Sequence, residues 1–88
     1  MNYASRKDGN HDQIIKAFEA MGCSVLDLSR VGAGCPDLLV ARSGVNVLVE
    51  IKDGNKKLRD NQTEFHATWK GKIKVVRAVK DVYDTSFV

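Results

Sequence analysis

The chain has 88 residues, a net charge of +3 and an apolar content of 43%. This length suits one small domain, residues 1–88, and the apolar content argues against a disordered chain. No apolar run is long enough to cross a membrane and the polar start is not a secretory signal, so an intracellular, cytoplasmic protein is expected. Cys23 and Cys35 lack zinc-site spacing and are expected to be free thiols in a reducing compartment.

The first predicted element is a helix over residues 10–21, with Asn10 or Asp8 as its cap. Its apolar residues recur at helical spacing and form one stripe: Ile14, Ile15, Phe18 and Met21. Gly22 is expected to end this helix. A short strand is expected over residues 25–28, followed by a glycine-rich loop.

Two apolar runs, residues 38–41 and 45–51, flank Ser43-Gly44 and predict a β-hairpin. A second helix is predicted over residues 59–69, and a last strand over residues 73–76. Because a helix connects the second hairpin strand to the last strand, these two strands should pair in parallel. The order helix-strand-strand-strand-helix-strand therefore predicts an α/β fold, with a mixed four-stranded sheet flanked by helices.

The second predicted helix carries two aromatic residues, Phe65 and Trp69, on one face. Trp69 is expected in the core rather than as a platform on which bases stack. Residues 81–88 are expected to form a short helical turn or a tail.

Polar residues stand at the two hairpin ends that should meet. Asp37 opens the first strand, and Glu50 and Lys52 stand near the end of the second. Side chains alternate along a strand, so Glu50 and Lys52 share one face and Ile51 takes the other. Two carboxylates supply hard oxygen ligands for Mg²⁺ or Mn²⁺, and a lysine can position or deprotonate an attacking water. An ion pair at a strand end is the alternative interpretation of this spacing.

Together these motifs resemble the virus-type replication-repair nuclease (VRR-NUC) family of the PD-(D/E)XK nuclease superfamily. The matching residues are Gly34-Cys35-Pro36-Asp37-Leu38-Leu39-Val40, Leu48-Val49-Glu50-Ile51-Lys52-Asp53-Gly54, Leu58, Gln62, Phe65-His66, Trp69, Gly71 and Val75-Val76, with Asp8-Gly9-Asn10 and Gln13-Ile14 upstream. The resemblance covers about residues 5–82. It implies a restriction-endonuclease-like core and an Mg²⁺- or Mn²⁺-dependent endodeoxyribonuclease of the stand-alone phage type.

The resemblance also implies roles for particular residues. Asp37, Glu50 and the backbone carbonyl of Ile51 would hold the metal, and Lys52 would orient or activate the water. Gln62 would face the active site and orient a water or the scissile phosphate through its amide.

An acidic residue on the first helix often completes such sites in the superfamily. The candidates are Asp8, Asp12 and Glu19, and the resemblance favours the start of the helix, near Asp12. DNA contacts are expected from Arg6, Lys7, Asn10, His11, Lys56, Lys57, Arg59 and His66. For His66, helix packing or DNA contact is favoured over a role as general base.

The loop glycines Gly32 and Gly34 are expected to let a DNA strand approach Asp37 closely. The loop lacks the GxxxxGK pattern, so no nucleotide cofactor is expected.

The resemblance implies a homodimeric Holliday-junction resolvase that cuts branched DNA, above all a four-way junction. Its setting would be phage DNA replication, recombination or repair in the cytoplasm of a bacterial host. The alternatives are a monomeric flap or nicking nuclease, and a structure-selective DNA-binding module without turnover. A fourth hypothesis is a small structural domain whose acids and lysine merely pair on the surface.

Overall fold

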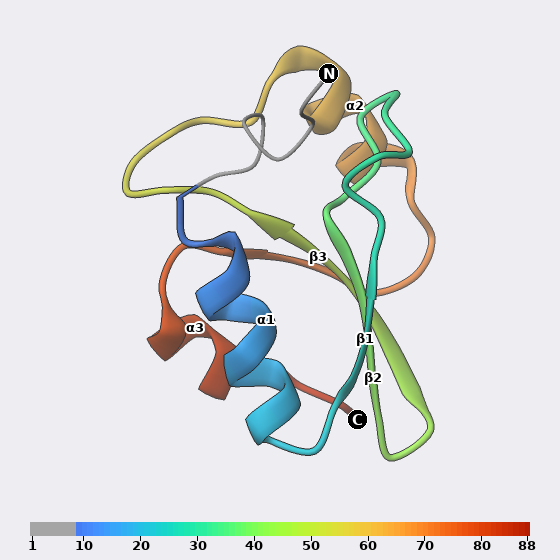
Figure 1. Cartoon of the computed structure of the whole chain (residues 1–88). Helices are drawn as coiled ribbons and strands as arrows, with labels where there is room; N and C mark the ends of the chain where they lie inside the picture. Colours follow the sequence, from blue (N-terminus) through green and yellow to red (C-terminus); the bar gives the residue numbers. More distant parts are fainter. Residues whose placement is uncertain (1–8) are drawn as a thin grey trace.

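A hairpin forms the centre of the computed structural model, which describes residues 9–88 (Figure 1). Strands β2 (Leu38–Arg42) and β3 (Val45–Ile51) pair antiparallel on either side of Ser43-Gly44. Both turn residues have positive φ, 54° for Ser43 and 78° for Gly44. Two such residues make the tight turn whose twist matches that of paired strands. The predicted hairpin is therefore confirmed.

The sheet has four strands in the order β1-β2-β3-β4. Strand β1 (Ser24–Asp27) pairs antiparallel with β2, while β4 (Ile73–Val76) pairs parallel with β3. The mixed sheet and the parallel pairing across the helical connection are as predicted.

Two helices cover one face of this sheet, and a third lies at its end. Helices α1 (His11–Ala20) and α3 (Val79–Tyr83) contact each other on the covered face. Helix α2 (Asp60–Thr68) lies at the end of the sheet where β3 finishes (Figure 1). The apolar stripe of α1 packs on inward-facing strand residues, and the largest members of this core are Ile14, Phe18, Leu38, Val40, Val49, Ile51 and Val76.

The end of α1 follows the prediction, but its start is built differently. Gly22 has a φ of 84° and ends the helix as predicted. Asn10 occupies the N-cap position without a capping hydrogen bond from its side chain. Its amide instead donates to the backbone carbonyl of Arg77 at 3.0 Å, which ties the start of α1 to the chain after β4.

Helix α3 begins at Val79, two residues before the segment 81–88 that was expected to hold a turn. The Asp81 carboxylate supports this earlier start, because it accepts the backbone N–H of the N-cap residue Ala78 at 3.2 Å and that of the preceding Arg77 at 2.8 Å. Between residues 9 and 88, no helix has the length and apolar character needed to span a membrane.

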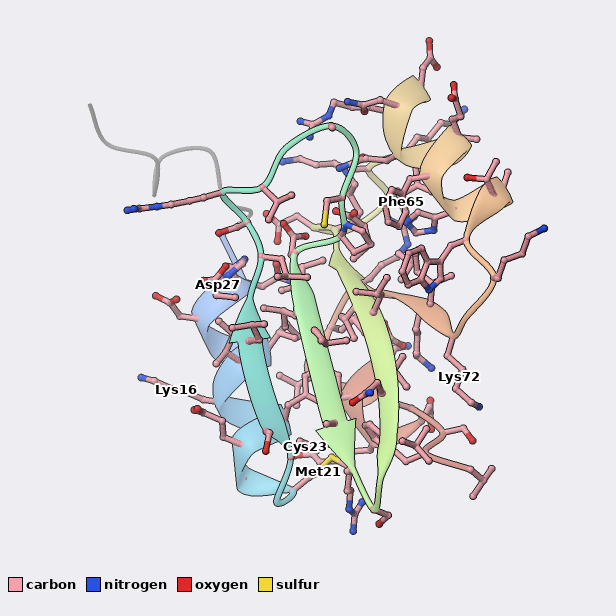
Figure 2. The ribbon with its side chains drawn as sticks, turned by 90° about the vertical axis from the view of Figure 1, so that its right-hand side faces the viewer. Lys16, Met21, Cys23, Asp27, Phe65 and Lys72 are labelled. Carbon is pink, nitrogen blue, oxygen red and sulfur yellow. The ribbon has the colours of Figure 1, made fainter. Side chains whose placement is uncertain are left out.

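The face of the sheet opposite α1 carries an apolar row, defined by Leu26, Leu39, Leu48 and Ile73. Each is the registered partner of the next, one from each strand. Figure 2 looks onto this face, with α1 and α3 behind the strands. Leu26, on the edge strand, is 56% exposed. Glu50 lies two residues beyond Leu48 in β3, so the candidate site adjoins this row on the same face.

Candidate active site

The antiparallel register brings Asp37 to Glu50. Leu38 pairs with Val49, so Asp37, one residue earlier, lies opposite Glu50. The Asp37 carboxylate accepts the backbone N–H of Ile51 at 2.8 Å, which holds it against the end of β3. Ile51 itself points into the core, so Glu50 and Lys52 lie on the other face. The predicted meeting of the two hairpin ends is confirmed.

Glu50 is a buried carboxyl group, only 1% exposed. Its pKa is raised to about 8, mainly by burial and further by the hydrogen bond and negative charge of Asp37. The positive charges of Lys52 and Arg59 act in the opposite direction. At neutral pH this carboxyl therefore keeps a proton unless a further positive charge enters the site.

Gln62 on α2 connects Glu50 to the start of that helix. Its amide nitrogen donates to Glu50 Oε2 at 3.2 Å, and its amide oxygen accepts the backbone N–H of Arg59 at 2.9 Å. Both ends of the buried amide are therefore engaged, and Gln62 faces the site as the resemblance implied. Its amide contacts the carboxyl group of Glu50, which makes Gln62 a positioning residue for Glu50.

The other Glu50 oxygen, Oε1, is buried without a hydrogen-bond partner, and so is Nε2 of His66. The two atoms lie 3.9 Å apart, too far for a hydrogen bond. Burial and the nearby Lys52 lower the pKa of His66, which favours its neutral form. The sequence interpretation of His66 as a packing or DNA-contacting residue did not foresee this closeness to Glu50. The signal was its spacing of four from Gln62, which puts both on one face of α2.

Lys52 is the last residue of the candidate site, and it directly follows the end of β3. Its backbone N–H donates to the carbonyl of Val76 at 3.0 Å, and the residue is 7% exposed. Its positive charge lowers the pKa of both Glu50 and His66. The buried carboxyl of Glu50 on β3 thus has around it Asp37, which precedes β2, Lys52, which follows β3, and Gln62 and His66 of α2.

The arrangement fits a divalent cation held by oxygen atoms. Glu50 Oε1 is a buried acceptor without a partner, and the Asp37 carboxylate adjoins it. Mg²⁺ commonly binds proteins through one or two carboxylates and keeps several waters. In the described part of the chain, no three His, Cys, Asp or Glu side chains gather closely enough to hold a metal.

The first-helix acids do not join this group. Asp12 and Glu19 are both exposed on α1, and neither belongs to a metal-binding cluster with Asp37 and Glu50. Asp12 as a further ligand therefore finds no support in this geometry. α1 packs on the opposite face of the sheet from Glu50, which is the physical reason. Asp8, Arg6 and Lys7 lie outside the described residues.

Several predicted DNA contacts are placed differently. His11 is buried, and its Nε2 lies 3.3 Å from an oxygen of Asp27, so it is no surface contact for phosphate. Asn10 is engaged with the carbonyl of Arg77. The loop residues Lys56, Lys57 and Arg59 are exposed and stay candidates for DNA contact, and the charge of Arg59 acts on Glu50.

The glycine-rich loop packs against α2 at Gly34, whereas a Cβ atom at Gly32 would meet nothing within 4 Å, so the approach of DNA to Asp37 stays a prediction. Gly34 has a φ of 79°, and a Cβ atom there would overlap with the carbonyl of Asn61. The glycine is thus required for contact between loop and helix. Cys35, which follows, is a free thiol whose pKa is raised by burial and by the negative charges of Glu50 and Asp37.

A comparison with solved structures finds a chain described as "VRR_NUC domain". The two chains are 33% identical, and the match covers 88% of this chain and 94% of the other, with a TM-score of 0.70. No family model and no curated protein matches this chain.

Proposed function

Since the chain belongs to the VRR-NUC family of nuclease domains, we propose that it is an Mg²⁺- or Mn²⁺-dependent DNA endonuclease that hydrolyses phosphodiester bonds. The observation that carries the proposal is the buried, unpartnered Oε1 of Glu50 beside Asp37 and Lys52. The alternative, an ion pair on the surface, predicts exposed carboxyl groups. It does not explain a buried Glu50 oxygen without a partner, because burying an unpaired charge is strongly disfavoured.

Asp37, Glu50 and the backbone carbonyl of Ile51 would hold the ion. When bound, the ion lowers the pKa of water and stabilises negative charge on the phosphate in the transition state. Gln62 keeps the carboxyl of Glu50 in one orientation through its 3.2 Å hydrogen bond, so the ligand oxygen is already in place. Lys52 would orient the attacking water, or take its proton, from the same face of β3.

The test is cleavage of labelled DNA by the purified protein in Mg²⁺ or Mn²⁺. Lys52→Met keeps the aliphatic part of the buried side chain and should abolish cleavage while DNA binding persists. Lys16→Met, an exposed lysine on α1, is the matched control and should cut like the unmodified chain. Cleavage retained by Lys52→Met, or equal loss in both variants, would contradict this assignment.

We further propose that the protein is a homodimer and that its substrate is branched DNA, above all a four-way junction. The apolar row supports the dimer, because Leu26 exposes a large apolar side chain on an edge strand. Two sites related by a two-fold axis would suit paired nicks in opposed strands.

Light scattering measures the mass of the protein in solution and so tests for the dimer. Leu26→Asp puts a charge into the apolar row and should convert the dimer to a monomer. Symmetric nicks in a junction, with flaps, splayed arms and linear duplex spared, are expected from the dimer. Cutting of flaps by a monomer would favour the nicking nuclease instead. Binding without any cutting, in either metal, would favour a DNA-binding module.

A further inference from the structure

An aromatic pair stands at the end of α2, beside the candidate site. The rings of Phe65 and Trp69 are stacked, with centroids 5.4 Å apart and planes inclined by 16°. Trp69 is nevertheless 47% exposed, so the expectation that it lies in the core is wrong. Phe65 covers part of the indole, and almost half of the residue remains open to solvent.

The indole is also held at its edge. A Cβ atom at Gly71 would lie 2.9 Å from Nε1 of Trp69, so the bare backbone of Gly71 passes directly against the ring. The backbone N–H of Trp69 donates to the carbonyl of Phe65 at 3.0 Å. Neighbours on two sides therefore restrict the ring, and ordering it on contact with a ligand would lose little entropy.

The segment that follows this ring in the sequence is positively charged. Lys70 and Lys72 lie on either side of Gly71, and both are exposed. No acidic residue occurs between Phe65 and Lys80. Figure 2 shows Phe65 and Lys72 on the same side of the molecule. An exposed aromatic ring between cations is the combination that binds single-stranded nucleic acids, since bases stack on the ring and phosphates pair with the lysines.

The ring is joined to the candidate site through α2, which carries two residues of the site and has Trp69 as its C-cap. Gln62 and His66 reach Glu50 at 3.2 and 3.9 Å. Trp69 is the C-cap residue of α2 and follows His66 by three residues, about one helical turn from a side chain that faces Glu50.

We propose that Trp69 stacks an unpaired nucleobase next to the cleavage site, with Lys70 and Lys72 on the flanking phosphates. The inference rests on the proposed function, because it takes DNA as the substrate. It narrows the branched substrate to DNA with an unstacked base at the branch point, and a single strand offers the same free base face for binding. A continuous duplex offers no free base face to the ring.

Trp69 is the sole tryptophan of the chain, so its fluorescence reports on this ring alone. In EDTA, which prevents cleavage, an oligonucleotide single strand and a splayed-arm duplex should both quench the emission. A blunt hairpin duplex should leave it almost unchanged. If the single strand quenches the emission and the splayed-arm duplex does not, the site binds only free single strands. That result would overturn the branch-point part of the proposal.

Binding is then measured by anisotropy of labelled DNA. Trp69→Ala should weaken binding of the splayed-arm DNA by about 5- to 150-fold, the range known for loss of one stacked base. Trp69→Phe keeps an aromatic face and should retain most of the affinity. Tyr83→Ala removes another exposed aromatic residue, 63% exposed on α3, and should change nothing.

Equal weakening of duplex and splayed-arm binding by Trp69→Ala would overturn the stacking role, as would unquenched emission in a bound complex. Unfolding curves of the three variants identify any that fail to fold, and Trp69→Phe is then the deciding variant. Normal cleavage of branched DNA with no effect of Trp69→Ala would refute this inference and leave the proposed function intact. Absence of both binding and cleavage would refute the proposed function itself.

Discussion

Replacing Glu50 with glutamine tests the electrostatics of the site without any assay of activity. Burial, and then Asp37, raise the pKa of Glu50 from 4.5 to about 8 in the folded protein. In the unfolded chain the carboxyl loses its proton at the lower value. The folded state therefore binds the extra proton between these two pH values, and stability falls as pH rises through this interval.

The interval between pH 6.5 and pH 8 is dominated by Glu50. The pKa of His66 is lowered from 6.5, so its opposite contribution to stability above pH 6.5 is limited to about 0.4 kcal/mol, from the unfolded chain's imidazole losing its remaining proton. The thiols of Cys23 and Cys35 have pKa values raised from 9.0 and contribute only at higher pH. Over 1.5 pH units, one proton changes the free energy of unfolding by about 2 kcal/mol.

Urea denaturation in EDTA at several pH values measures this slope. Because Glu50 is itself half deprotonated at pH 8 and His66 opposes the slope, the unmodified chain should lose about 1–1.5 kcal/mol of stability from pH 6.5 to pH 8. Glu50→Gln has no ionisable group there and should show little slope, so it should be the more stable protein at pH 8. Glu19→Gln changes an exposed acid on α1 and should keep the slope of the unmodified chain.

Mn²⁺ extends the same experiment to the proposed ion. A cation bound by the ionised carboxylate should restore stability of the unmodified chain at pH 8, in proportion to the logarithm of its concentration. Glu50→Gln should respond much less. A flat pH profile for the unmodified chain, or an equal slope in Glu50→Gln, would refute the reasoning about a protonated Glu50.

Two further substitutions test the packing around the site. Gln62→Ala removes the amide that donates to Glu50, and its loss should lower the free energy of unfolding by about 1–3 kcal/mol in urea denaturation. Gln13→Ala, on the exposed side of α1, should change it by less than about 0.5 kcal/mol, and similar losses in both would count against the buried hydrogen bond. Gly34→Ala and Gly32→Ala both put a Cβ atom on a backbone with positive φ, 79° and 78°. Only the Cβ atom at position 34 would also overlap with α2. Thermal unfolding should therefore show the greater loss for Gly34→Ala, and equal losses would contradict the close packing of the loop.

The hairpin and its polar ends could be predicted because their causes are local. Ser43-Gly44 sets the turn, and alternation along the strand puts Glu50 and Lys52 on one face. Antiparallel pairing then brings Asp37 to Glu50 with no further information. The family resemblance added Gln62, whose contact with Glu50 depends on where α2 lies.

Residues whose role depends on neighbours distant in sequence were predicted less well. Trp69 has a large apolar side chain, which favours the core in a sequence-based prediction. However, α2 lies at the end of the sheet and leaves about half of the residue exposed. His11 is a polar residue at a helix start, which favours a surface contact with phosphate in a sequence-based prediction. The packing of α1 instead buries it against Asp27.

The sequence by itself determined the order of elements, the hairpin register and the meeting of Asp37 with Glu50, since turn chemistry and strand alternation act over a few residues. Only the tertiary structure decided the burial of Glu50, the approach of His66 and the exposure of Trp69. Burial is a property of all the surrounding elements together, and the packing of α2 against the end of the sheet is what sets it here.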